Sequence, residues 1–268
     1  MSELIVKNVG FSGAELENVL NEAAILSVRA NHEKISVSDI DEAIDRVMAG
    51  PAKKTKVISE RCKRMVAYHE AGHAVVGLKV ADAETVQKIT IIPRGDAGGY
   101  VLMTPEQDQF LETKGELLDE ICGLLGGRIS EEVFFDDITT GAHNDIEKAT
   151  RIARLMVTEF GMSNLGPIQY EKNSGSVFLG RDYTNSQRSF SSEVGKEIDR
   201  EVRRIIDECY AKAKAIIVEN RETVQLIAQT LLIHETLTNE QIVHLVDKGY
   251  LPGEEPINPY IEENNEEN

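Results

Sequence analysis

Several features that would assign the chain to a common class are missing from its 268 residues. No apolar run is long enough to cross a bilayer, and the N-terminus lacks the basic and then apolar stretch of a signal peptide. The three cysteines, Cys62, Cys122 and Cys209, are far apart and form no Cys-x-x-Cys pair. A disulfide framework and a cysteine-ligated structural zinc are therefore not expected, and we predict reduced, mostly buried thiols.

An excess of positive charge is missing as well. The chain has 29 Lys and Arg against 46 Asp and Glu, which gives a net charge of −17. Nucleic-acid binders depend on basic side chains that face phosphates, so this charge argues against that class of protein. With 41% hydrophobic and 28% charged residues, the composition is that of a soluble globular protein. The length allows one large domain or two ordinary ones.

The segment from His69 to His73 points directly to chemistry. Two histidines four residues apart, with a glutamate directly after the first, match the HExxH pattern of zinc hydrolases. On an α-helix, His69 and His73 lie about 40° apart around the axis, so both can bind one ion. Glu70 is turned by about 100° from His69 and can hold a water beside the metal. We therefore predict two metal ligands, His69 and His73, and one catalytic base, Glu70.

A third protein ligand is expected, because catalytic zinc usually takes three and leaves a position for water. Asp145 lies on the apolar face of a helix predicted from Asn144 to Phe160, and Glu132 lies on that of a helix predicted from Lys114 to Val133. A buried acid needs a partner, and a metal is one. An acid in the first turn of a helix is also favoured by the helix dipole alone. Periodicity therefore leaves both acids open as the third ligand.

Helical periodicity dominates the rest of the chain, so we predict a mainly α fold with a small β-hairpin or sheet. A strand is expected at 86–92, a turn at 93–99 and a return strand at 100–103. Gly126 and Gly127, inside a predicted helix, are expected to permit close helix–helix approach. Further helices are expected at 11–29, 36–50, 61–80, 191–220, 221–235 and 238–246.

Several ordered motifs resemble a known family. Gly10–Leu16 and Asn21–Ala24 resemble the C-terminal helical lid of an AAA+ ATPase. Val57–His73 and Thr139–Asp145 resemble the peptidase domain of the FtsH family, which are membrane-anchored AAA+ zinc proteases. The resemblance covers nearly everything from about Gly10 to about Leu251. It implies a lid fragment at 1–52 and a zinc metallopeptidase domain at 53–252. Beyond them the chain is rich in Glu, Asn and Pro without apolar periodicity, so an acidic disordered tail is expected at 253–268.

The chain departs from the family pattern in one large respect. It has neither a GxxxxGK[ST] loop nor an acidic Walker-B strand, so alone it is expected neither to bind nor to hydrolyse ATP. The transmembrane segments of the family are missing too. We therefore expect a soluble fragment cut just inside the lid, with Met1 added ahead of it.

The resemblance also assigns residues. It selects Asp145 as the third metal ligand, because the segment around it is similar to the third-ligand segment of the family. Glu132 is then expected to orient a ligand imidazole from behind. The segment Gly98-Gly99-Tyr100 is expected to hold an extended substrate by backbone pairing, as a strand at a sheet edge can. His143 occupies a variable position of the motif and is not expected to bind metal.

The predicted function is a zinc-dependent endopeptidase for unfolded or membrane proteins, the peptidase part of an ATP-dependent protease. The resemblance implies polypeptide substrates, a homo-hexameric ring, an AAA+ ATPase module in the full-length chain, and a place on the cytoplasmic side of the cell inner membrane. One alternative is a non-catalytic oligomerisation module, against which the intact HExxH pattern argues. The other is a stand-alone zinc peptidase, against which the lid at the N-terminus argues.

Overall fold

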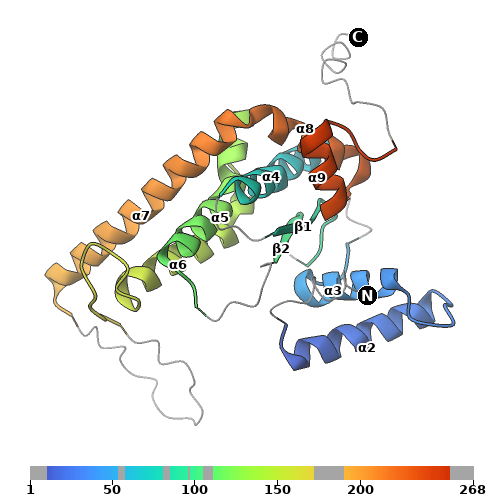
Figure 1. Cartoon of the computed structure of the whole chain (residues 1–268), viewed down its shortest axis with the longest axis horizontal. Coiled ribbons are helices and arrows are strands. Elements are labelled where there is room, and N and C mark those ends of the chain that lie inside the picture. Colours follow the sequence, from blue (N-terminus) through green and yellow to red (C-terminus); the bar gives the residue numbers. More distant parts are fainter. Residues whose placement is uncertain are drawn as a thin grey trace.

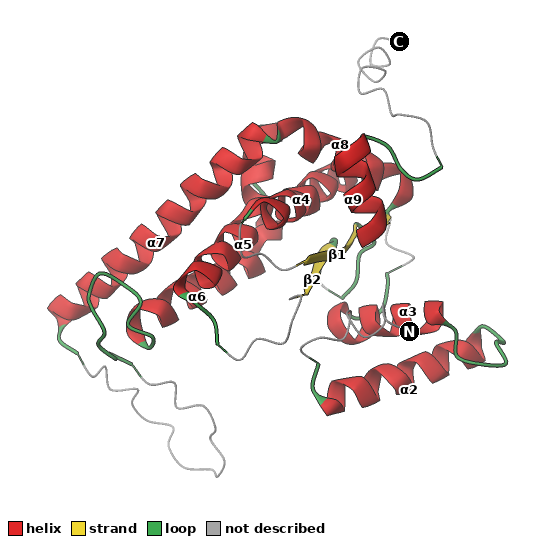
Figure 2. Ribbon diagram, in the orientation of Figure 1, coloured by secondary structure: helices red, strands yellow, loops and turns green. Residues whose placement is uncertain are grey.

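The computed structural model describes residues 11–53, 58–80, 85–95, 97–104, 111–171 and 190–253. Helices dominate these ranges and surround one small sheet, so the mainly α prediction is confirmed (Figure 1 and Figure 2). The elements are α2 (Gly13–Arg29), α3 (Val37–Ala49), α4 (Glu60–Lys79), β1 (Thr85–Thr90), β2 (Tyr100–Thr104), α5 (Lys114–Phe135), the 3₁₀ turn η1 (Thr140–Ala142), α6 (His143–Thr158), α7 (Ser192–Glu219), α8 (Arg221–His234), β3 (Thr236–Thr238) and α9 (Asn239–Lys248).

Helices α2 and α3 form a hairpin with its own hydrophobic cluster. Each begins with a capping box, Ser12 with Glu15 in α2 and Ser36 with Asp39 in α3. The buried apolar residues of the hairpin are Val19, Ala23, Ala43 and Ile44. Among the described residues this cluster shares no member with the main core, so the hairpin packs as a small separate unit beside the larger body (Figure 1).

Helix α4, which carries the HExxH pattern, lies at the centre of the larger body. It packs against α5 on one side and α8 on another, and α5 packs in turn against α6 and α7. All residues of α4 from Ala67 to Gly77 are buried. A Cβ added to Gly72 would lie 2.5 Å from the carbonyl oxygen of Gly126 on α5. Glycine at these positions therefore lets the two backbones touch, which confirms the close approach predicted for Gly126.

The sheet is antiparallel, with the strand order β2-β1-β3. The predicted hairpin is present, with Ile89 opposite Val101, and β3 pairs with the other side of β1, where Leu237 lies opposite Ile89. β3 was not predicted, because three residues are too few to show an alternating pattern. Strand β2 therefore forms one edge of the sheet.

The other predicted helices and strands agree with the structure within two residues at each end. The predicted tail beyond 253 falls outside the described residues. Across the part of the chain that is described, none of the helices combines the length and the apolar character needed to cross a membrane.

Candidate metal centre

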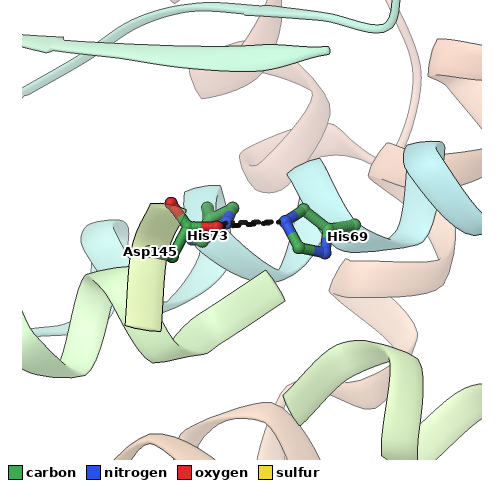
Figure 3. A group of neighbouring side chains, drawn as sticks. All are labelled: His69, His73 and Asp145. Atoms are coloured by element: carbon green, nitrogen blue, oxygen red, sulfur yellow. Dashed lines mark hydrogen bonds and ion pairs between the residues drawn. The ribbon is translucent and has the colours of Figure 1, made fainter. Parts of the chain in front are cut away.

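Three of the predicted residues bring their side chains to one point. The Nε2 atoms of His69 and His73 lie 3.0 Å apart, and each lies 3.5 Å from Oδ2 of Asp145. Figure 3 shows the side chains turned toward one another, the histidines from α4 and Asp145 from the first turn of α6. Among the described residues they form a group of ligand atoms that one metal ion could bridge. His143, at the start of α6, is exposed and does not belong to this group.

The separations suit a tetrahedral zinc ion. Two ligand atoms that are each about 2.0–2.1 Å from a tetrahedral zinc lie about 3.3 Å from one another. The observed values of 3.0 Å and 3.5 Å lie on either side of this distance. Small side-chain adjustments would therefore allow three protein ligands and leave a fourth position for water or substrate.

The hydrogen bonds of the two imidazoles require a positive charge, from a proton or a metal ion, between their Nε2 atoms. Nδ1 of His69 lies 2.7 Å from Oε1 of Glu131, and Nδ1 of His73 lies 2.8 Å from the carbonyl oxygen of Gly123. Because a carboxylate and a carbonyl only accept, both Nδ1 atoms carry the proton. Two neutral rings would then direct their Nε2 lone pairs at each other, which requires a proton or a metal cation between them.

The carboxylates around the ring of His69 also favour a positive charge at this point. Burial opposes protonation of His69, but the Asp145 and Glu131 carboxylates outweigh it and raise its pKa to about 10. Burial likewise opposes ionisation of Asp145, and its contacts with both imidazoles still hold its pKa well below the usual range. Without metal, a proton thus satisfies the site, and a metal ion would have to displace it.

The acid that contacts a ligand imidazole is Glu131, and Glu132 lies elsewhere. Glu131 also accepts hydrogen bonds from the amide and hydroxyl of Thr139, at 2.6 Å and 2.9 Å, just ahead of η1 and α6. It therefore links His69 on α4 to the segment that leads to Asp145. Glu132 instead bonds to Tyr210 and Lys214 on α7. The expectation that Glu132 orients a ligand imidazole is therefore wrong, and Glu131 makes that contact.

We expect the Glu131→Gln variant to bind zinc about 10- to 100-fold more weakly. The neutral amide loses the charge that favours the His69 Nδ1–H, and its NH₂ group would face a Thr139 donor or the imidazole. Zinc titration of the metal-free protein by calorimetry measures the change. Glu132→Gln is the matched control, since it alters the neighbouring residue and should leave zinc affinity unchanged. Equal losses in both variants would contradict the assignment.

Glu70 lies beside the three ligand atoms but outside their group. It is 6% exposed, and its burial, with some help from Asp145, raises its pKa against the opposing influence of the two histidines. A Cβ added to Gly99 would lie 2.9 Å from Oε1 of Glu70. The carboxylate of Glu70 therefore faces the segment that leads into β2.

The segment Gly98-Gly99-Tyr100 lies at the edge of the sheet, next to Glu70. Tyr100 is the first residue of β2, and its hydroxyl donates to Asp45 on α3. Gly99 has no room for a side chain, because a Cβ would also lie 2.6 Å from the carbonyl oxygen of Thr90. Glu70 and Thr90 therefore enclose the backbone of Gly99 directly ahead of β2.

Comparison with known proteins gives matches along most of the chain. Models of "Peptidase family M41" and of the "AAA+ lid domain" match residues 56–245 and 9–42. The chain is 56% identical to the "ATP-dependent zinc metalloprotease FtsH" of Bacillus subtilis (strain 168), over 94% of this chain and 40% of that protein. It is 54% identical to the protein of that name from Alkalihalophilus pseudofirmus, over 98% of this chain and 39% of that protein. The corresponding protein of Acholeplasma laidlawii is 56% identical over 93% and 39%. The chain thus spans about two fifths of these relatives.

Proposed function

Because the chain belongs to peptidase family M41, we propose that it is the proteolytic part of an ATP-dependent zinc metalloprotease. Its reaction is the hydrolysis of peptide bonds within unfolded or membrane polypeptides. The observation that carries the proposal is the convergence of His69, His73 and Asp145 on one point, with the buried acid Glu70 beside it. A non-catalytic module would have no need for this arrangement.

Each residue of the site has a separate role in this proposal. His69, His73 and Asp145 would hold the zinc ion, which would polarise the scissile carbonyl and lower the pKa of water to about 7. Glu70 accepts a proton from the attacking water and delivers it to the nitrogen of the leaving amine. The raised pKa of Glu70 suits both halves of this transfer. Glu131 and the Gly123 carbonyl hold the rings in the tautomer that presents Nε2 to the metal.

Substrate binding is proposed at the edge of β2. An extended polypeptide can add to this edge by backbone hydrogen bonds, which depend little on side-chain identity. The position of Gly99 against Glu70 supports this choice of strand, because pairing there brings a backbone carbonyl near the site. Broad specificity for unfolded chains follows from recognition of the backbone.

Removal of metal is expected to abolish hydrolysis of casein, and added zinc is expected to restore it. The purified protein is treated with EDTA, dialysed, and assayed before and after addition of zinc or, as a control, magnesium. Atomic absorption should find about one zinc ion per chain in the active sample. Casein hydrolysis that persists in metal-free protein, or a folded protein that binds no zinc, would overturn the proposed function.

We also propose that the chain works within a homo-hexameric ring, joined to an AAA+ ATPase module at the cytoplasmic side of a membrane. The match of residues 9–42 to an AAA+ lid supports the partnership with an ATPase. Helix α2 exposes 58% of Leu20 and 75% of Val28, as expected of a lid that packs against another module. Light scattering tests the ring, and a monomer at all concentrations would count against self-assembly of this part.

A further inference from the structure

A polar cluster joins the α2–α3 hairpin to the sheet beside the metal centre. Asp45, on α3, is 5% exposed. Its Oδ2 accepts from Lys88 Nζ of β1 at 2.6 Å and from Arg94 Nη2 at 3.1 Å, and its Oδ1 accepts from the Tyr100 hydroxyl of β2. Arg94 also donates to both carboxylate oxygens of Glu42 on α3, at 3.2 Å and 2.6 Å. One lid helix thus holds two strands and the loop between them.

The cluster is balanced in charge and largely buried. Lys88, Arg94 and Arg46 supply three positive charges. Asp45, Glu42 and Glu22 supply three negative ones, because Arg46 pairs with both glutamates. Arg94 is 4% exposed. Burial together with the Asp45 carboxylate raises the pKa of Tyr100, so the Tyr100 hydroxyl keeps its proton and remains a donor. Buried charges stabilise a fold only where partners are well placed, so such a cluster favours one relative position of the elements that carry it.

Few other features fix the hairpin against the sheet. The hydrophobic clusters of the hairpin and of the main body share no residue among those described. Among the described residues, the backbone at the end of α3 adds the hydrogen bond of the Ala52–Arg94 bridge, from the Lys53 amide to the Pro93 carbonyl at 2.8 Å, and the Gly50 carbonyl accepts from Arg94 Nη1 at 3.4 Å. Figure 1 shows α3 next to β1 and β2, with α2 on its far side. The side-chain cluster is therefore the main specific link.

The residue that follows Gly99, Tyr100, contacts Asp45, and Gly99 itself lies against the proposed catalytic acid, Glu70. The Tyr100 hydroxyl donates a hydrogen bond to Asp45. Its neighbour Gly99 lies against the Glu70 carboxylate and the Thr90 carbonyl. β2 forms the sheet edge to which we assign the substrate, so its position sets the distance between a paired polypeptide and Glu70. A shift of α3 would therefore reach the substrate strand while the three ligand side chains, on α4 and α6, stay in place.

We propose that Asp45 is a positioning residue, which acts through Tyr100 to hold strand β2 at the place where it binds an extended polypeptide. The inference rests on the proposed function, because it takes β2 as the substrate strand. It adds a role for the lid helix within the peptidase site itself: the placement of α3 sets how well the site binds substrate. Displacement of α3 weakens the binding of polypeptide without weakening the binding of zinc.

The test compares Asp45→Asn and Tyr100→Phe in the zinc-loaded protein. Fluorescence anisotropy of labelled, unfolded casein gives Kd in the presence of the Glu70→Gln substitution, which prevents cleavage, and KM is measured with Glu70 intact. We expect each variant to raise Kd and KM about three- to tenfold, the equivalent of roughly one lost hydrogen bond. The double variant should bind no more weakly than Asp45→Asn alone, because Tyr100→Phe removes only a contact that Asp45→Asn already weakens. Zinc affinity should stay unchanged throughout.

Ser12→Ala is the matched control. It removes the capping box of α2 and destabilises the hairpin by about 1 kcal/mol, but it leaves the cluster intact. A loss of about 1 kcal/mol leaves a protein of ordinary stability almost fully folded, so Ser12→Ala should not alter Kd. An equal rise in Kd for Ser12→Ala, or unchanged Kd in folded Tyr100→Phe, would overturn the inference, and the latter decides the matter even if Asp45→Asn fails to fold. Absence of zinc-dependent hydrolysis in the unaltered protein would instead overturn the proposed function, and the anisotropy result would still decide the role of Asp45.

Discussion

The Glu70→Gln variant is expected to lose casein hydrolysis by a factor of about 10² to 10⁴ while it binds zinc as tightly as the unaltered protein. Glutamine keeps the size of the side chain but cannot take a proton from water at neutral pH. Glu70 lies outside the group formed by His69, His73 and Asp145, so the metal keeps its ligands. The rate is measured with labelled casein, and zinc affinity by calorimetry.

A measurement of thermal stability distinguishes the loss of the catalytic base from unfolding of the Glu70→Gln protein. Burial raises the pKa of Glu70 above its ordinary 4.5, which means that folding opposes the charged form. Above the unfolded pKa, the charge therefore costs stability, and a neutral side chain removes that cost. The metal-free Glu70→Gln protein should accordingly unfold at the same temperature as the unaltered protein or at a higher one. Inactivity with a lowered Tm would point to a damaged fold.

Glu60→Gln is the control on the same helix. Glu60 is exposed in the first turn of α4, far along the helix from the metal ligands, so its substitution should leave hydrolysis unchanged. If Glu70→Gln retains more than about a tenth of the activity, the proton transfer must be assigned to another group.

The central helix could be predicted because its signal is local. The spacing of His69, Glu70 and His73 fixes their relative placement on any helix, and the structure brings the two histidines together as that spacing requires. Periodicity alone does not select Asp145, because position in a first turn and position on an apolar face are common to many acids. Resemblance selected Asp145 from two candidates, and the structure places it with the histidines.

Glu131 and Glu132 show where periodicity stops being informative. Helix α5 is packed against α4 on one side and α7 on the other, so it has two inner faces. Adjacent residues are about 100° apart around a helix, and here one faces each neighbour. Glu131 contacts His69 on α4 and Glu132 contacts Lys214 on α7. The sequence of α5 does not say which neighbour lies on which side.

The polar cluster around Asp45 could not be predicted from the sequence for a similar reason. Asp45 meets Tyr100 across 55 residues of chain, and Lys88 across 43. Each residue alone looks like an ordinary charged or polar residue on a helix or strand. Only the tertiary arrangement, which depends on how the hairpin docks, shows that they share one buried carboxylate.

Gly127→Ala is the second substitution with a large expected effect, and we expect it to reduce zinc affinity by about 100-fold, the upper end of the usual effect of a residue that positions the ligands. A Cβ at Gly127 would lie 2.5 Å from Nε2 of both His69 and His73, which is closer than nonbonded atoms approach. The methyl group would occupy the space between the two ligand nitrogens on the side of α5. Either the imidazoles rotate away or α5 moves back from α4, and both changes separate the ligands. Calorimetric titration of metal-free protein with zinc measures the loss.

Gly123→Ala, one helical turn earlier, distinguishes this steric effect from the general effect of a methyl group in α5. A Cβ at Gly123 has nothing within 4 Å, and the carbonyl that accepts from His73 belongs to the unchanged backbone. Alanine there should stabilise the helix by up to about 1 kcal/mol and leave zinc affinity unchanged. At Gly127 the same gain is set against an overpacking cost of about 1–3 kcal/mol, so metal-free Gly127→Ala should fold with modest loss while its zinc site fails. Tight zinc binding by a folded Gly127→Ala protein would mean that the ligands do not need this space, and the metal would then have to lie elsewhere than between the two Nε2 atoms.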